Sequence, residues 1–168
     1  MNIEQKAKEF AEYHHKLQTR KYTGEPYINH PAAVANIVRS VPHTTEMLAA
    51  AWLHDTVEDT EATLMDVRQK FGDKIADMVD MLTDVSKPSD GNRKARKAID
   101  RAHTAQASPE AKTIKLADLI DNAHNIIERD PEFAKVYLVE KSALLEVLTE
   151  GDPTLYMKAS EIVRHTPN

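Results

Sequence analysis

Three prolines that stand just inside the start of an apolar segment constrain this chain more than any other feature. Each follows a residue type that caps helices well, in the pairs Ser108-Pro109, Asp130-Pro131 and Asp152-Pro153. Proline is tolerated in the first turn of a helix because its missing N–H is not needed there. A preceding Ser or Asp can accept a hydrogen bond from one of the free backbone N–H groups. The pattern predicts helices that start at residues 109, 131 and 153.

The rest of the chain indicates the same class of fold. No stretch alternates apolar and polar residues for long enough to require a strand. The chain has only four glycines and few aromatic residues, whereas Ala, Leu, Lys, Glu and Asp are abundant. We therefore predict an all-α bundle of about nine helices, at residues 2–17, 31–40, 45–54, 63–71, 73–85, 93–106, 109–128, 131–149 and 153–164.

The length, charge and composition of the chain exclude several classes of protein. A chain of 168 residues is most simply one domain, 1–168, with a substantial core. Its net charge of −5 is not typical of a nucleic-acid binder. No window approaches the ~18 apolar residues of a membrane span, and the N-terminus lacks the apolar part of a secretory signal. We expect a cytoplasmic protein without nucleic-acid or membrane partners. The absence of cysteine excludes disulfides, thiolate ligands and a cysteine nucleophile.

The stretch "WLHDTVEDT" (52–60) concentrates polar side chains at the end of an apolar run. It carries His54, Asp55, Glu58 and Asp59, whereas a solvated helix end needs only one or two charges. If the helix persists this far, His54 shares a face with Glu58, and Asp55 with Asp59. Crowded carboxylates beside a buried helix repel one another and lose hydration, and a divalent cation removes both costs. The stretch therefore predicts a cation site.

Two further residues can complete such a site. His30 precedes Pro31 at a predicted helix entrance, from which its ring can turn inward. Asp118 lies on a narrow polar stripe of the mostly apolar helix predicted at 109–128. Imidazole and carboxylate ligands suit Mn²⁺, Fe²⁺, Zn²⁺ or Mg²⁺. The four candidate metal ligands are His30, His54, Asp55 and Asp118.

Each of these residues also has an ordinary interpretation. An isolated His-Asp pair is often a cap or a surface pair, and a histidine before proline is often a capping residue. The remaining histidines have no comparable acidic neighbours, and we expect ordinary roles for His14, His15, His43, His103, His124 and His165.

Three segments together resemble a known family: "TRKYTGEPYINHPAAVANIV", "AAWLHDTVEDTEATLMDVRQKFG" and "KTIKLADLIDNAHNI". They are similar to the hydrolase half of the RelA/SpoT enzymes and to its stand-alone form, the small alarmone hydrolases of the MESH1 type, in the HD phosphohydrolase superfamily. The resemblance covers residues from about 8 to 150, and no synthetase domain is expected. It implies an HD-type helical bundle that binds one Mn²⁺ and hydrolyses the 3′-pyrophosphate of ppGpp and pppGpp.

The resemblance also implies roles for individual residues. The metal ligands it implies are the four candidates reached above. Glu58 and Asp59 match the catalytic acidic pair of the family. Asn122 matches an asparagine that binds the ribose–phosphate part of the substrate. Arg20 and Lys21 match a basic pair that lies along the nucleotide base, where a guanidinium can stack.

A polyanionic substrate requires local positive charge in an acidic protein. The segment "NRKARKAIDRAH" is a second basic region, in which Arg93, Arg96 and Lys97 share a helix face. Small alarmone hydrolases carry basic residues here, so these three are candidates for phosphate binding, although alternating basic residues are also common on solvated helices. We expect Lys115 to pair with carboxylates instead. Tyr137 matches a tyrosine that can pack near the base.

Two departures from the family leave other functions open. The loop 86–92 is longer than in animal relatives, and Phe133 stands one turn before Tyr137, where those relatives carry a basic residue. One alternative is therefore another nucleotide substrate, such as a nucleoside monophosphate or NADPH, whose 2′-phosphate the MESH1 type also removes. The other alternative is a non-catalytic nucleotide-binding or regulatory module. The intact pair Glu58 and Asp59 argues against that alternative.

Overall fold

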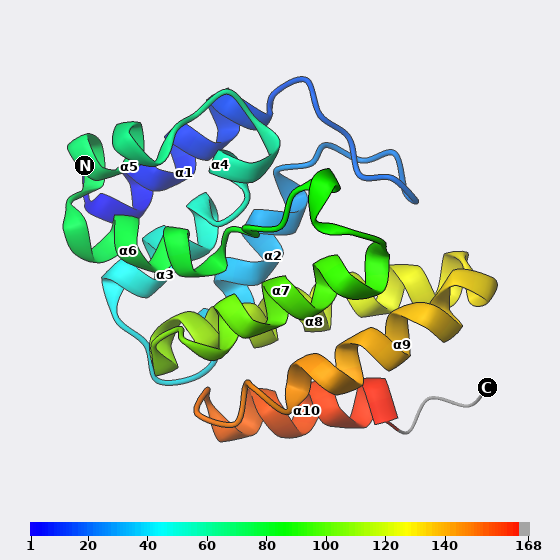
Figure 1. The fold of residues 1–168 in the computed structure, drawn as a ribbon. Helices are drawn as coiled ribbons and strands as arrows, with labels where there is room; N and C mark the ends of the chain where they lie inside the picture. The colour runs from blue at the N-terminus through cyan, green and yellow to red at the C-terminus, as the bar shows by residue number, and fades with distance from the viewer. Residues whose placement is uncertain (165–168) are drawn as a thin grey trace.

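Helices make up nearly all of the regular structure in the computed structural model, which describes residues 1–164 (Figure 1). His165 and the end of the predicted 1–168 domain lie outside the described residues. In chain order the elements are α1 (Ile3–His15), α2 (Asn29–Arg39), α3 (Thr45–Leu53), α4 (Thr56–Asp59), α5 (Leu64–Phe71), α6 (Asp73–Leu82), the 3-10 helix η1 (Pro88–Asp90), α7 (Arg93–Ala105), α8 (Pro109–Arg129), α9 (Pro131–Leu145) and α10 (Pro153–Arg164).

The predicted all-α class is confirmed, and each predicted helix is present. Two short elements, α4 and η1, were not predicted. Three predicted helices extend at least two residues too far, because α1 ends at His15 rather than residue 17, α6 at Leu82 rather than residue 85 and α9 at Leu145 rather than residue 149. The connection 18–30 contains an isolated antiparallel bridge between Thr19 and Pro26.

Local capping explains where the three proline-led helices begin. The Ser108 hydroxyl accepts a hydrogen bond from the Ala111 N–H at 3.2 Å. The carboxylates of Asp130 and Asp152 accept in the same way, from Phe133 at 3.1 Å and from Leu155 at 3.0 Å. These bonds satisfy N–H groups that have no partner within the helix. The start sites were therefore predictable from residue type alone.

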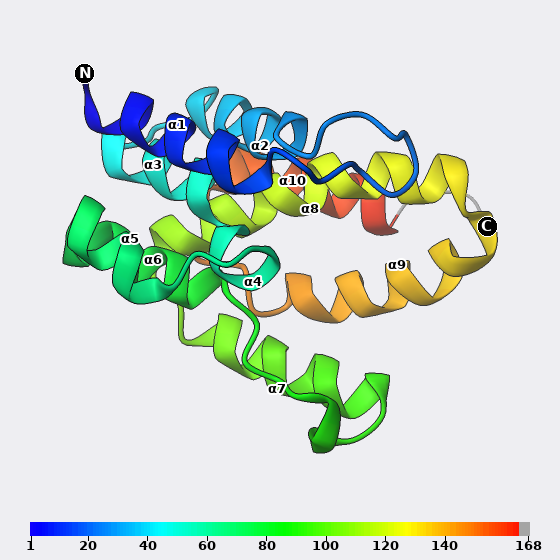
Figure 2. The ribbon, with the colours of Figure 1, turned by 90° about the horizontal axis from the view of Figure 1, so that it is seen from above.

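The core is organised around α3 and α8. Every residue of α3 from Met47 to Leu53 is buried, and α8 buries Ile114, Leu116, Leu119 and Ile120. α3 packs against α1, α2 and α6, whereas α8 packs against α2 and α10. Figure 2 shows α1, α2 and α3 along one side of the molecule and α7 along the opposite side.

A single glycine makes the sharp turn between α5 and α6. Gly72 adopts φ 89°, and its N–H donates to the Arg68 carbonyl while its own carbonyl accepts from Ala76. A residue with a Cβ is strained at such a positive φ, so glycine is the natural choice.

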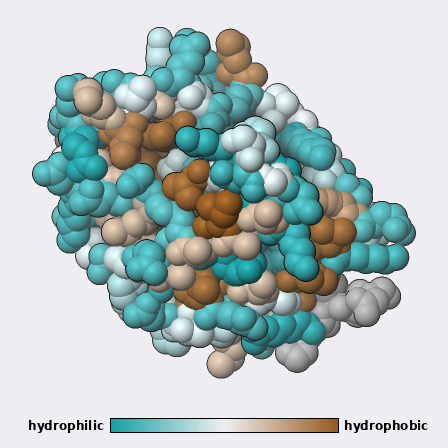
Figure 3. Space-filling model, in the orientation of Figure 1, coloured by the Kyte–Doolittle hydropathy of each residue, from teal (hydrophilic) through white to brown (hydrophobic). Residues whose placement is uncertain are grey.

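Exposed apolar side chains are scattered rather than concentrated. Figure 3 shows several separate apolar patches within a largely hydrophilic face. The most exposed large apolar residues belong to different segments, among them Leu17, Met65, Val139 and Met157. Within residues 1–164, no helix has the length and apolar character that crossing a membrane would require.

Candidate metal centre

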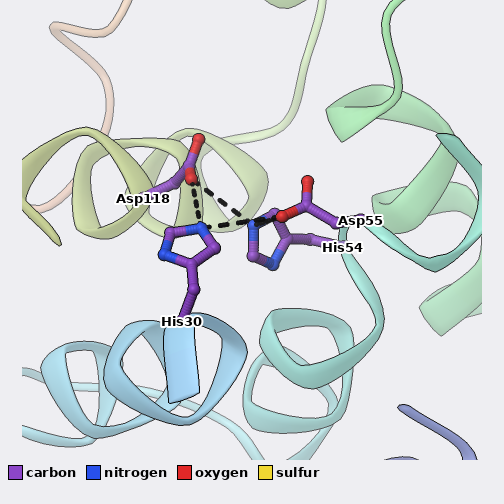
Figure 4. Close-up of side chains that lie close together, drawn as sticks. All are labelled: His30, His54, Asp55 and Asp118. Atoms are coloured by element: carbon purple, nitrogen blue, oxygen red, sulfur yellow. Dashed lines mark hydrogen bonds and ion pairs between the residues drawn. The ribbon is translucent and has the colours of Figure 1, made fainter. Parts of the chain in front are cut away.

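Four side chains from separate segments meet where α2, α3 and α8 come together. His30 lies in the first turn of α2, Asp118 lies in the middle of α8, and His54 and Asp55 occupy the break between α3 and α4. One ligand atom from each residue lies within 4.8 Å of the others. Figure 4 shows the two imidazoles and two carboxylates converging on a common point. The structure thus brings together the four ligands predicted from sequence.

The break after Leu53 allows two consecutive residues to reach that point. The helix does not persist through residue 59, which was the condition for His54 to share a face with Glu58 and Asp55 with Asp59. It stops at Leu53, Asp55 adopts φ −102° and ψ −1°, and α4 begins at Thr56. The Thr56 hydroxyl donates to the Leu53 carbonyl at 2.7 Å and stabilises the turn. Adjacent residues on a regular helix diverge by about 100°, and His54 and Asp55 lie at a helix end, where both side chains can reach one point.

Hydrogen bonds on the far side of each imidazole orient its second nitrogen toward the cluster. His54 Nδ1 lies 2.6 Å from the Ala51 carbonyl oxygen, which only accepts, so Nδ1 carries the hydrogen. His30 Nδ1 lies 2.7 Å from an Asp121 carboxylate oxygen. In the neutral rings, both Nε2 lone pairs therefore face the two clustered carboxylates. This backing of each ring is the arrangement that metal-binding histidines use.

One buried nitrogen supports a cation at this position. His54 is 3% exposed, and its Nε2 atom has no hydrogen-bond partner within the described part of the chain. Asp55 Oδ2 and Asp118 Oδ1 lie 3.0 and 3.4 Å away, which is an electrostatic contact without hydrogen-bond geometry. Two nitrogen and two oxygen donors of this kind fit a divalent cation.

The surrounding charges keep both clustered carboxylates ionised. Burial alone would raise the pKa of Asp118, but Lys115, His30 and His54 hold it well below its usual value. Lys115 Nζ lies 3.5 Å from Asp118 Oδ2, which confirms the expected pairing of this lysine with a carboxylate. The Asn122 amide also donates to Asp118 Oδ1 at 3.0 Å. Asp118 is therefore presented as a charged ligand.

The clustered carboxylates favour a proton on each imidazole. Burial opposes a charge on His54, but Asp55 and Asp118 outweigh it and raise its pKa well above the usual value. The pKa of His30 is raised by Asp118 and Asp121 against the same burial effect. Metal binding must displace such protons, so the affinity for a cation falls as pH is lowered.

A second carboxylate group adjoins the cluster. Ligand atoms of Asp55, Glu58 and Asp59 lie within 4.8 Å of one another. Glu58 Oε1 accepts a hydrogen bond from the Asp84 N–H at 2.8 Å, and Asp59 is 3.4 Å from the Tyr27 hydroxyl. Both side chains reach solvent, yet their pKa values are raised, to about 7 for Glu58 and about 6 for Asp59. Partial desolvation is the larger cause, and neighbouring negative charge is the second. Such groups can accept and release protons near neutral pH.

Residues that support the cluster were not predicted. The Tyr27 hydroxyl donates to Asp55 Oδ2 at 2.7 Å. The buried His15 ring packs on Tyr27 with 4.9 Å between centroids, and the Gln18 amide donates to the Asp59 carbonyl at 3.3 Å. His15 therefore has a place beside the site rather than the unrelated role expected for it. One feature of the sequence could have indicated a supporting residue, because Asp121 lies three residues after Asp118 and so shares a helix face with it.

Asp121 provides a direct test of how the site is oriented. Its Oδ2 contacts His30 Nδ1 at 2.7 Å and Arg20 Nη2 at 3.0 Å. We expect Asp121→Asn to weaken Mn²⁺ binding by about 10- to 100-fold, because the amide no longer fixes the tautomer of His30. Calorimetric titration of metal-stripped protein with Mn²⁺ measures the effect. Unchanged affinity in a folded Asp121→Asn protein would show that His30 needs no such support.

The basic pair and Asn122 line one cavity next to the cluster. Arg20, Lys21, Tyr22, Tyr27 and Asn122 contribute to a cavity of about 150 Å³. The Arg20 guanidinium lies 3.4 Å from the Asn122 side-chain oxygen. The structure therefore groups three of the predicted substrate residues on one side of Asp118.

The other predicted substrate residues lie elsewhere. Arg93 forms two hydrogen bonds with Glu140, at 2.7 and 3.0 Å, and its guanidinium lies 5.1 Å from the centre of the Phe133 ring. Arg96 has a buried Nε without a hydrogen-bond partner in residues 1–164. Tyr137 is buried against Phe133. Lys97 lines a second cavity, separate from that of Arg20.

Comparison with known proteins identifies the class to which this fold and site belong. A model of the HD domain matches residues 7–144. The guanosine-3′,5′-bis(diphosphate) 3′-pyrophosphohydrolase MESH1 of Drosophila melanogaster is 33% identical over 164 residues, which cover 93% of this chain and 90% of that protein. The probable GTP pyrophosphokinase of Mycobacterium leprae is 38% identical over 133 residues, or 79% of this chain but only 17% of its own length.

A solved structure gives the same result. A metazoan ortholog of SpoT that hydrolyses ppGpp and plays a role in starvation responses superposes with a TM-score of 0.87 at 30% identity, covering 98% of this chain and 96% of that one. The chain therefore belongs to the HD domain family. Within it, the chain is homologous over most of its length to ppGpp hydrolases of the MESH1 and SpoT type.

Proposed function

We propose that this protein is a metal-dependent phosphohydrolase that removes the 3′-pyrophosphate of ppGpp and pppGpp and releases pyrophosphate with GDP or GTP. The observation that carries the proposal is that the four-residue cluster and the group of Asp55, Glu58 and Asp59 share Asp55. The similarity to MESH1 over nearly the whole chain supports this substrate class.

We propose His30, His54, Asp55 and Asp118 as the metal ligands and Mn²⁺ as the ion they hold. When bound, a divalent cation polarises a phosphoryl oxygen and lowers the pKa of water. The nitrogen and oxygen donors also accept Fe²⁺, Zn²⁺ or Mg²⁺. The choice of Mn²⁺ rests on family resemblance.

The two acidic side chains account for proton transfer. A water molecule attacks the phosphorus that is bonded to the 3′-oxygen, and the bond between that phosphorus and the 3′-oxygen breaks. Glu58 or Asp59 accepts the proton of the attacking water, and the other acid returns a proton to the ribose oxygen. Their raised pKa values place both forms within reach near neutral pH. Phosphoryl transfer needs positioning and charge neutralisation rather than a protein nucleophile, which agrees with the absence of cysteine.

The cavity beside Asp118 suits the nucleoside. Its Arg20 side chain can stack on a base, and Lys21 adds positive charge at the rim. Asn122 lies one turn from Asp118 and can reach a ribose or a phosphate bound at the cluster. We propose this cavity for the base and ribose of the guanosine polyphosphate.

The test is pyrophosphate release from ppGpp by metal-stripped protein before and after Mn²⁺ is added. We expect release only with Mn²⁺. Matched assays with NADPH and a nucleoside monophosphate separate the substrate alternatives. Activity on these compounds alone would show that ppGpp is not the substrate, while metal-dependent phosphate hydrolysis would still be supported. Tight ppGpp binding without turnover in Mn²⁺ would instead indicate a non-catalytic binding module.

A further inference from the structure

A second cavity adjoins the cluster at the opposite end of the polar stripe on α8. It measures about 100 Å³, and Lys97, Arg101, Lys115 and Lys141 are among the residues that line it. Asn122, in the first cavity, and Lys115, in the second, are seven residues apart on α8, with Asp118 between them. At 1.5 Å per residue, the two positions are separated by roughly 10 Å along the helix. A ligand held at Asp118 can therefore extend into both cavities.

The acidic residues around this second cavity are largely committed elsewhere. Asp100 accepts hydrogen bonds from the Val85 and Ser86 N–H groups and from the Ser86 hydroxyl, at 2.6–2.9 Å. Glu140 accepts both bonds of the Arg93 fork. Asp84 is the remaining carboxylate of the lining. The lining of the cavity therefore holds fewer carboxylates than cations, and two of its carboxylates already accept other hydrogen bonds.

Three of the four cations form no close ion pair with any of the described residues. Lys115 pairs with Asp118. No carboxylate oxygen among the described residues lies within 4.0 Å of Lys97, Arg101 or Lys141, whereas ion pairs at this distance are present elsewhere in the fold. With four cations and three carboxylates in its lining, the cavity has an excess of positive charge next to the metal cluster.

Lys141 is the most informative of these residues. It projects from α9 with its amine 5.1 Å from the centre of the Tyr137 ring, and only part of its side chain is exposed. Burial, together with the positive charges of Lys115 and Lys97, lowers its pKa to about 8. Holding an amine in such a position costs free energy unless an anion occupies the space that it faces.

We propose that this cavity, with Lys97, Arg101 and Lys141, is a second oxyanion site that binds a phosphate group of the nucleotide other than the one held at the metal cluster. The inference rests on the proposed function for the identity of the nucleotide. The group is either the outer phosphate of the leaving pyrophosphate or the 5′-diphosphate. Both phosphate groups present the same charged oxygens to Lys97, Arg101 and Lys141.

Kinetic constants for Lys141→Met and Arg101→Gln test the site. We expect each variant to raise KM for ppGpp about tenfold or more while Mn²⁺ affinity is unchanged, because a charge-assisted hydrogen bond to phosphate is lost. Lys135→Met is the matched control, since Lys135 is an exposed lysine of the same helix that pairs with Glu132. Its KM should equal that of the unmodified protein. Unchanged KM in both cavity variants would overturn the proposal.

A binding measurement separates this inference from the proposed function. Inorganic phosphate is titrated into the Mn²⁺-loaded protein by calorimetry, with a blank titration into buffer containing Mn²⁺. Weaker phosphate binding in Lys141→Met and Arg101→Gln supports the oxyanion site even if ppGpp is not a substrate. Equal phosphate binding in all proteins overturns it, whatever the substrate proves to be.

Two arms distinguish the source of the phosphate. With a guanosine substrate that carries a single 5′-phosphate, a smaller effect of Lys141→Met on KM assigns the site to the 5′-diphosphate. An undiminished effect, together with weaker product inhibition by inorganic pyrophosphate, assigns it to the leaving group. Either result supports a second oxyanion site.

Discussion

Replacing Asp55 by alanine is expected to abolish Mn²⁺-dependent pyrophosphate release, with a loss of roughly a thousandfold or more, equivalent to about 4 kcal/mol in the barrier. Asp55 Oδ2 lies 3.0 Å from His54 Nε2 and 3.6 Å from His30 Nε2, so its removal takes a charged ligand from the centre of the cluster. Rates measured against added Mn²⁺, together with metal content after dialysis, report the loss.

Thermal unfolding supplies an independent reading of the same variant. A ligand that binds only the folded state stabilises it by about 4 kcal/mol at a concentration a thousandfold above its Kd. Mn²⁺ should therefore raise the melting temperature of the unmodified protein but not that of Asp55→Ala. The control is Glu161→Ala, which removes an exposed carboxylate on α10. Stoichiometric Mn²⁺ and full activity in Asp55→Ala would contradict the assignment of this ligand.

Replacing Glu58 by glutamine is expected to lower kcat by about 10²- to 10⁴-fold while the protein retains its metal, because the amide cannot accept the proton of the attacking water. The substitution keeps the shape of the side chain and an oxygen that can accept the Asp84 N–H. Measurements of kcat and Mn²⁺ affinity separate this loss from that of Asp55→Ala. A fully active Glu58→Gln enzyme would contradict the role of Glu58.

Glu58→Gln is expected to stabilise the metal-free protein at high pH, although it lowers kcat. Partial burial and neighbouring negative charge raise the pKa of Glu58 to about 7 in the folded state, from an ordinary value of 4.5. The folded state then binds the proton more tightly, so the associated stability is present below pH 4.5 and is lost as pH rises through 7. Glu58→Gln removes this loss. Urea unfolding in the presence of a chelator should find the variant more stable than the unmodified protein at pH 8 and similar at pH 4.5, which also shows that a loss of rate is not a loss of fold.

The sequence predictions were most accurate where a feature depends on residues that are close together in the chain. The starts of α8, α9 and α10 depend on capping groups within three residues, and they were predicted correctly. Helix ends were less certain, because α9 stops at Leu145 within a segment that could continue as a helix. The pairing of Lys115 with Asp118 was also a local, same-face contact. Local chemistry explains each of these results.

Supporting contacts in the site span most of the chain and were missed. Tyr27 reaches Asp55 from 28 positions away, and His30 reaches Asp121 across 91 positions. The end of α3 was predicted to within one residue, at 54 rather than Leu53, but the short helix α4 that follows it was not predicted. No pattern of spacing within one helix carries such information.

By itself, the sequence determined the all-α class, the main helices and the candidate ligands, because capping and periodicity act between near neighbours and the ligand motifs are specific. Only the tertiary structure decided which nitrogen of each histidine faces the cluster, because the other nitrogen is held by a carbonyl or carboxylate that folding brings to it. It also placed Lys97, Arg101 and Lys141 along one cavity, together with Lys115 and three carboxylates. The charge of that cavity depends on side chains of α7, α8 and α9, which come together only in the folded chain.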